Sequence, residues 1–108
     1  MLSEHTENDL VRGMHILEFQ EMMRRIYLQR DLERGMKGTY DWLVDEIGEL
    51  GEALESGQKD AAGKEFADVL AWLASLANTV GTDLETAAIE KYNNKCPRCG
   101  CCPCRCKP

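Results

Sequence analysis

Residues 42–55 read WLVDEIGELGEALE, and residues 65–80 read EFADVLAWLASLANTV. Each stretch carries two acids three residues apart: Glu46 with Glu49, and Glu65 with Asp68. Because residues three apart lie on one face of a helix, each stretch predicts a helix that presents two carboxylates on one side. This doubled spacing is the most informative feature of the chain.

The apolar residues of the two stretches support the helical prediction, since they recur at helical spacing and form one stripe on each helix. These predicted core positions are Leu43, Ile47, Leu50 and Leu54 in the first stretch, and Phe66, Val69, Leu73, Leu76, Ala77 and Val80 in the second. The connection between the stretches, residues 56–61, is short and contains Gly57, which favours antiparallel packing. Antiparallel packing would place Glu49 near Glu65, Glu46 near Asp68, and Trp42 near Trp72.

Four uncompensated carboxylates repel one another and are costly to remove from water. The pattern therefore predicts a divalent cation held by Glu46, Glu49, Glu65 and Asp68. Oxygen ligands in that number suit Mg²⁺, with Mn²⁺ as a substitute. The alternative is a solvated acidic face, but the repetition of the pair and the position of Asp68 inside an apolar run favour the metal site.

The composition indicates a small all-α protein. A chain of 108 residues is the size of one domain, and no alternating pattern typical of a strand occurs in it. We expect a four-helix bundle completed by homodimerisation, with a loop over residues 33–39. The expected helices span residues 10–32, 42–55, 61–80 and 82–93, with residues 1–9 as a polar segment that contains His5.

Local sequence signals predict where these helices begin and end. Thr39 or Asp41 is expected to cap the second helix, and Asp60 the third. Gly81 is expected to end the third helix, and Thr82-x-x-Glu85 reads as a capping box for the fourth. His15 and Gln20 have no partner that the sequence reveals and are interpreted as structural.

The net charge and the residues that follow Met1 argue against some classes of function and location. The formal net charge is −6, from 19 acidic and 13 basic residues, which argues against a nucleic-acid-binding groove. No apolar run follows Met1, so no secretory signal is expected and the cytoplasm is the default location. No segment predicts a membrane span.

All six cysteines fall in residues 96–108, which divides the chain into a helical domain (1–95) and a cysteine-rich tail. The spacing of Cys96 and Cys99 followed by Cys104 and Cys106 predicts a zinc knuckle, with Cys101 and Cys102 as spare ligands. The alternative is a disordered thiol-rich tail. A disulfide framework is not expected in a chain without a secretory signal.

The two acid pairs, WLVDEIGEL followed by EFADVL, resemble the E-x-x-E and E-x-x-D signature of the MazG-like all-α nucleotide pyrophosphohydrolases. The segment AIEKYNNKCP that ends at Pro97 is similar to the end of that family's last helix. The resemblance covers about residues 16–97.

The resemblance implies an all-α homo-oligomer, a dimer or a tetramer, that uses Mg²⁺ to hydrolyse nucleoside triphosphates to the monophosphate and pyrophosphate. Glu46, Glu49, Glu65 and Asp68 would then be the metal ligands, and Glu49 is the candidate general base. Lys91, Asn94 and Lys95 would contact the substrate phosphates. The two tryptophans, Trp42 and Trp72, are interpreted first as core or interface residues, although their alignment with the acids leaves a base-stacking role open.

Two alternatives remain open at the level of the sequence. One is a phosphoribosyl-ATP pyrophosphohydrolase, which shares the fold and the acid pattern. The other is a non-catalytic helical dimer whose cysteine tail binds zinc and docks a partner.

Overall fold

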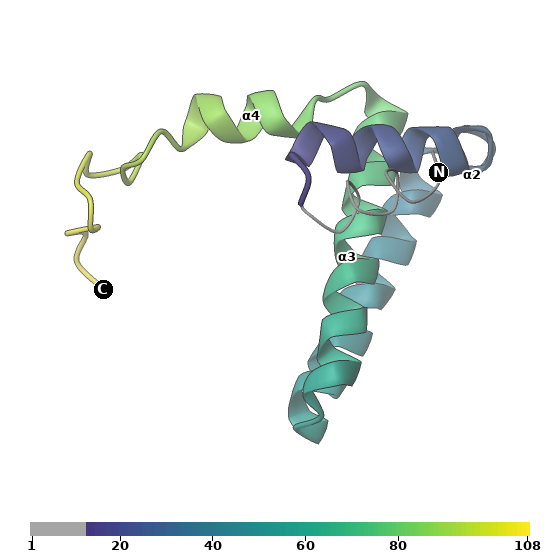
Figure 1. Cartoon of the computed structure of the whole chain (residues 1–108), viewed down its shortest axis with the longest axis horizontal. Coiled ribbons are helices and arrows are strands. Elements are labelled where there is room, and N and C mark those ends of the chain that lie inside the picture. The colour runs from purple at the N-terminus through teal and green to yellow at the C-terminus, as the bar shows by residue number, and fades with distance from the viewer. Residues whose placement is uncertain (1–12) are drawn as a thin grey trace, which may run out of the picture.

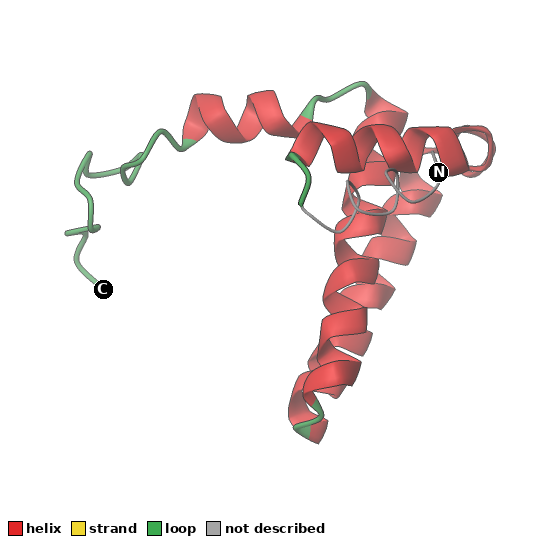
Figure 2. Ribbon diagram, viewed as in Figure 1, coloured by secondary structure: helices red, strands yellow, loops and turns green. Residues whose placement is uncertain are grey.

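The computed structural model describes residues 13–108, which contain three helices and no strand. The helices are α2 (Ile16–Ser56), α3 (Lys59–Val80) and α4 (Leu84–Lys91). The second part of α2 and α3 lie side by side as an antiparallel hairpin, while the first part of α2 crosses one end of this hairpin (Figures 1 and 2). The all-α prediction and the antiparallel packing are therefore confirmed. None of the described helices combines the length and the apolar character that a membrane span needs.

The bend in α2 lies at Gly35, whose φ of 83° and ψ of 171° interrupt the helical backbone. This combination of angles is essentially restricted to glycine, because a side chain would clash with the backbone. The described residues therefore contain three helices and not the predicted four, because the first two predicted helices are the two parts of α2. The break between them falls at Gly35, inside the predicted loop over residues 33–39, but that loop is wrong. A single glycine is enough to redirect the helix, so no loop is needed between its two parts, residues 16–34 and 36–56.

A buried polar cluster holds this bend. The Arg34 guanidinium donates a hydrogen bond to Asp31 Oδ1 at 3.0 Å and one to Thr39 Oγ1 at 3.4 Å, and so connects the two sides of the bend. Thr39 and Asp31 are almost completely buried. Thr39 therefore lies inside α2 and does not cap a new helix, which corrects the predicted cap at Thr39 or Asp41.

The observed ends of α3 and α4 agree only in part with the ends predicted from the sequence. Gly81 ends α3 with a φ of 76°, as predicted. The cap of α4 is Asp83, whose carboxylate accepts a hydrogen bond from the Thr86 N–H, so the expected capping box starting at Thr82 is wrong by one residue. Similarly, α3 begins after Gln58, and Asp60 lies in its first turn, where an acid favours the positive end of the helix dipole.

The first and last helices are shorter than expected. Residues 13–15 are not helical, and α2 begins at Ile16, where the Glu18 carboxylate accepts a hydrogen bond from the His15 N–H. The expected polar segment 1–9 and residues 10–12 lie outside the described residues. At the other end, α4 stops at Lys91, two residues before the predicted end.

Gln20 joins all three helices through buried hydrogen bonds. Its side-chain N–H groups reach Asn78 Oδ1 at 3.0 Å and the Thr82 carbonyl at 2.7 Å, and its Oε1 accepts from the Leu84 N–H at 2.9 Å. The Asn78 side chain in turn donates to the Gln20 carbonyl at 3.1 Å. The interpretation of Gln20 as structural is correct, and its partners lie about sixty residues away in the sequence, where no local pattern could reveal them.

The apolar core within one chain is small. Among residues 13–108, its buried members are Met23, Leu43, Ala62, Ala74 and Ala77. Of the predicted core stripes, Leu43 and Ala77 are buried, but several large apolar side chains are exposed on the hairpin: Ile47, Leu54, Phe66, Leu73 and Val80. These positions have the periodicity of a core without being covered by the chain itself.

We predict that Gln20→Ala destabilises the fold by about 2–4 kcal/mol, because Asn78 Oδ1 loses its nearer donor and both the Thr82 carbonyl and the Leu84 N–H lose their side-chain partner. The measurement is the free energy of unfolding from urea denaturation followed by circular dichroism. Gln29→Ala, at an exposed position of the same helix, is the matched control and should change stability by less than about 0.5 kcal/mol. Equal effects of the two substitutions would contradict the role of Gln20 as the junction.

Candidate functional site

Three of the four predicted acids converge. One carboxylate oxygen from each of Glu46, Glu49 and Glu65 lies within 4.8 Å of the other two. Glu46 and Glu49 come from α2, and Glu65 comes from the first half of α3, so the antiparallel hairpin brings the two pairs together. Asp68 lies outside this group and is exposed, but it is close enough for its charge to act on Glu46.

The surroundings of Glu46 disfavour the ionised form of its carboxyl group. Burial, a hydrogen bond with Glu65 and the charges of Glu49, Glu65 and Asp68 together raise the pKa of Glu46 from 4.5 to about 7, and burial contributes most. Near neutral pH the cluster therefore holds a proton that an isolated glutamate would have released. Groups with shifted pKa values in such a cluster are typical of functional sites.

Two oxygens of this cluster lack a partner. Glu46 Oε2 and Glu65 Oε2 are buried and accept no hydrogen bond from any residue between 13 and 108. Buried carboxylate oxygens are costly unless a donor or a cation satisfies them. Three carboxylates with free oxygens on one side form a ligand set of the hard oxygen type, which fits Mg²⁺ or Mn²⁺.

The two tryptophans stack beside the acids. The rings of Trp42 and Trp72 are nearly parallel, at 13°, with centroids 5.7 Å apart, which confirms the predicted proximity of the pair. The Arg34 guanidinium lies over the Trp72 ring at 4.7 Å from its centroid. This stack therefore combines aromatic faces with a positive charge next to the carboxylates.

A cavity of about 270 Å³ opens between the first part of α2 and α3. Its lining residues are Tyr27, Arg30, Asp31, Arg34, Asp68, Ala71, Trp72 and Ser75. Asp68 thus faces the cavity, and Trp72 joins the cavity to the aromatic stack. A polar and aromatic lining of this kind suits a small polar ligand with a flat ring.

Asp31 and Arg34 are lining residues that the sequence analysis missed. Asp31 is buried, and its Oδ2 has no hydrogen-bond partner among the described residues. The signal was present in the sequence, because position 31 follows Met23 and Tyr27 at steps of eight and four residues and so falls on the inward face of the helix. An acid at a core position is rare enough to have been noticed.

The predicted phosphate-binding residues lie elsewhere in the chain. Lys91 ends α4, and Asn94 and Lys95 follow it, Asn94 with a positive φ of 60°. Helix α4 leads away from the α2–α3 hairpin (Figure 1). Lys91 and Lys95 line a second cavity together with residues of the cysteine tail, and no acid of the cluster lines it. Within one chain, these three residues are not brought together with Glu46, Glu49 and Glu65.

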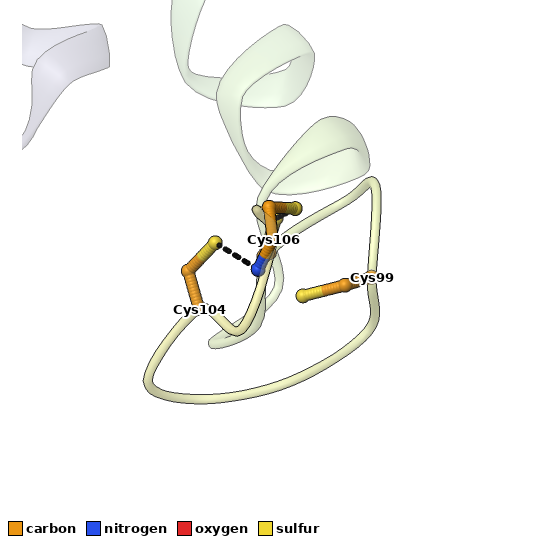
Figure 3. Close-up of side chains that lie close together, drawn as sticks. Cys99, Cys104 and Cys106 are labelled. Carbon is orange, nitrogen blue, oxygen red and sulfur yellow. Dashed lines mark hydrogen bonds between the residues drawn. The ribbon is translucent and has the colours of Figure 1, made fainter. Parts of the chain in front are cut away.

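Four tail cysteines also converge. The sulfur atoms of Cys96, Cys99, Cys104 and Cys106 all lie within 4.8 Å of one another, and this group could hold a zinc ion. Figure 3 shows three of these thiols around one point. Backbone N–H groups of Arg105 and Cys101 lower the pKa of the Cys99 thiol to about 6, while hydrogen bonds with Cys104 and Cys96 raise the pKa of Cys106 to about 11.

The pKa of Glu46 makes the stability of the metal-free protein depend on pH. Because the folded-state value of about 7 lies above the ordinary 4.5, the protonated carboxyl favours the fold below pH 4.5, and this stabilisation is lost as the pH rises through 7. We predict that Glu46→Gln stabilises the metal-free protein at about pH 8, by about 1–2 kcal/mol after allowance for partial solvent exposure.

The measurement is the midpoint of thermal unfolding in EDTA across this pH range, and the wild-type and Glu46→Gln curves should meet below pH 4.5. Glu52→Gln, at an exposed acid of the same helix outside the cluster, is the control and should follow the wild type at every pH. A Glu46→Gln protein that is no more stable than the wild type at about pH 8 would contradict the electrostatic description of the cluster.

The comparison with known families agrees with this geometry. The model of the MazG nucleotide pyrophosphohydrolase domain matches residues 34–100, which include the acid cluster, both tryptophans and α4. No curated protein matches the chain. The matched segment covers more than half of the sequence and contains the helical hairpin that assembles the carboxylates, and the chain therefore belongs to the MazG nucleotide pyrophosphohydrolase family.

Proposed function

We propose that the protein hydrolyses nucleoside or deoxynucleoside triphosphates to the monophosphate and pyrophosphate, with Mg²⁺ as its cofactor and Mn²⁺ as a substitute. The observation that carries this proposal is the convergence of Glu46, Glu49 and Glu65 from two helices of a MazG domain, with two buried oxygens left free. A purely structural acidic cluster would gain nothing from this arrangement, because it costs stability at neutral pH.

Glu46, Glu49, Glu65 and Asp68 are the proposed metal ligands. The first three already lie together, and Asp68 is one helical turn beyond Glu65, so a rotation of its exposed side chain would bring it to the cluster. A divalent ion held there would neutralise negative charge on the triphosphate and on the departing pyrophosphate. The hairpin holds the carboxylates of Glu46, Glu49 and Glu65 together, and burial keeps water away from Glu46 Oε2 and Glu65 Oε2.

Glu49 is the proposed general base that orients and deprotonates the water attacking the α-phosphorus. It is the exposed member of the converging three, so its carboxylate can contact a water molecule. Glu46 is less suited to this role, because burial and the hydrogen bond with Glu65 keep a proton on it up to about pH 7. A base must also lie within hydrogen-bond reach of the proton that it takes, which places it at the edge of the cluster.

The stacked tryptophans are the proposed contact for the nucleobase. Trp72 belongs both to the stack and to the cavity lined by Asp68, so a base lying on this ring would keep its phosphates near the carboxylates. Arg34, which lies over Trp72, adds a positive charge at the same place. Aromatic faces accept any base, and selection among bases would come from polar groups such as Asp31.

A homodimer is the proposed assembly. Four large apolar side chains of α3 share one exposed stripe: Phe66, Leu70, Leu73 and Val80. Exposed apolar stripes of this length mark interaction sites, and a second copy offers the same complementary surface. Because α4 leads away from its own hairpin (Figure 1), Lys91, Asn94 and Lys95 would contact the phosphates held by the other copy.

We predict that Glu49→Gln and Asp68→Asn each lower the rate of Mg²⁺-dependent pyrophosphate release by more than about 100-fold, since even residues that only support a metal ligand contribute about 10- to 100-fold. The helical circular dichroism of both variants should equal that of the wild type. The assay measures monophosphate and pyrophosphate from a panel of nucleotides that includes phosphoribosyl-ATP.

Glu55→Gln is the matched control, because Glu55 is an exposed acid of the same helix and lies outside the cluster. It should retain the wild-type rate. An Asp68→Asn protein with full activity would remove Asp68 from the site. Turnover of phosphoribosyl-ATP alone would assign the protein to that substrate, and no turnover of any nucleotide would refute the proposed function.

We predict that Leu73→Lys converts the dimer to a monomer, because a charge at the centre of the α3 stripe must be desolvated in the interface. The measurement is the molar mass by light scattering during gel filtration. Ile26→Lys is the control, since Ile26 is also apolar and is more exposed than Leu73, but lies on the first part of α2. A wild-type protein that is monomeric at high concentration would contradict the proposed assembly.

A further inference from the structure

We propose that Cys96, Cys99, Cys104 and Cys106 form a tetrahedral zinc site that folds the C-terminal tail, separate from the acidic cluster on the hairpin. The first argument is convergence, because the four sulfur atoms lie within 4.8 Å of one another, in a segment of only eleven residues. Four cysteine ligands are the usual complement of a structural zinc ion, which needs no open position.

The backbone around the first two cysteines forms a tight knuckle. The Gly100 N–H donates to the Cys96 carbonyl at 2.7 Å, and the Cys96 N–H donates to the Cys101 carbonyl at 2.9 Å. Gly100 has a φ of 74°, which a residue with a side chain adopts only at a cost. The turn therefore directs Cys96 and Cys99 to the same side before the chain returns with Cys104 and Cys106.

Backbone amides also point at the sulfurs. The Arg105 N–H lies 3.4 Å from Cys99 Sγ, and the Cys106 N–H lies 3.3 Å from Cys104 Sγ. Figure 3 shows the second of these contacts. Hydrogen bonds to the sulfur atoms of ligating cysteines orient the ligands and stabilise their negative charge, in the way that outer contacts tune other metal sites.

The charges of the segment complement such a centre. A zinc ion with four thiolates carries a net charge of −2. The chain as a whole is acidic, yet no acidic residue follows Glu90, and the last eighteen residues carry five bases: Lys91, Lys95, Arg98, Arg105 and Lys107. The absence of carboxylates also leaves only sulfur ligands in the tail, which select zinc over Mg²⁺.

The structure distinguishes four cysteines from the other two. Cys101 lies near the Cys99 carbonyl, at 3.6 Å, and Cys102 is exposed, and neither belongs to the converging group. The sequence alone left Cys101 and Cys102 as competing ligands. They now serve as matched controls, because they have the same chemistry and lie inside the same segment.

A bound zinc would fix a basic hollow at the end of α4. The cavity there is about 870 Å³, and it is lined by Lys91, Lys95 and Arg98 together with Tyr92, two prolines and five of the tail cysteines. The tail is too short to bury a core, so a metal is the available means of ordering it. The zinc site would thus hold Lys95 and Arg98 in place relative to α4.

The test uses the full chain, purified under reducing conditions, treated with EDTA and then titrated with Zn²⁺ in excess Mg²⁺. Native mass spectrometry should show one tightly bound zinc, and Co²⁺ in its place should give the intense visible bands of a tetrahedral sulfur site. The double variant Cys101→Ser/Cys102→Ser should bind with wild-type affinity. Cys99→Ser and Cys106→Ser should each weaken binding by more than about 100-fold.

A second control separates this site from the proposed enzyme. The double variant Glu46→Gln/Glu65→Gln, which removes the hairpin cluster, should still bind one zinc with the same cobalt spectrum. Loss of that zinc would overturn the proposal, as would wild-type affinity in Cys99→Ser, the absence of zinc binding in the wild type, or iron as the tightly held metal. None of these readouts depends on nucleotide hydrolysis.

Discussion

The repulsion among Glu46, Glu49 and Glu65 is the constraint around which this structure is arranged. Three carboxylates within 4.8 Å can stay together only if a proton or a cation compensates them, and the raised pKa of Glu46 shows that a proton already does so in part. The rest of the fold keeps the acids from separating. The antiparallel hairpin fixes their distance, and the stacked tryptophans close one end.

Polar contacts determine the shape of the molecule beyond the hairpin, since the apolar core within one chain is small. Gln20 ties the first part of α2 to the end of α3 and the start of α4, and Arg34 links Asp31 to Thr39 across the bend at Gly35. Hydrogen bonds have directions, so they specify one crossing of the helices where apolar packing alone would allow several. The bend in turn brings Asp31 and Arg34 to the cavity beside Trp72.

The sequence predicted what depends on local periodicity and missed what depends on distant partners. Spacing was enough to predict the helices of the hairpin, their antiparallel order and the approach of Glu46, Glu49 and Glu65, because the side chains of a helix repeat regularly. The loop over residues 33–39 was wrong, since Gly35 and Gly38 both suggested a break and only Gly35 provides one. The helical spacing from Met23 to Asp31 indicated an inward position, but the cavity that Asp31 lines also needs Asp68, Ala71, Trp72 and Ser75 of α3, which no local pattern reveals.

The chain separates two kinds of metal ligand by position. Carboxylates gather on the hairpin, where stiff helices hold them, whereas thiols gather in a tail that has no helix and no core of its own. Hard oxygen ligands favour Mg²⁺, and soft sulfur ligands favour zinc, so each cluster discriminates against the metal of the other. The helices hold the three carboxylates together without a metal ion, so under the proposed function the cluster could exchange ions and substrate while the hairpin stays folded. The tail has only its thiols and a few backbone hydrogen bonds, and the proposed zinc ion would supply the further contacts that order it.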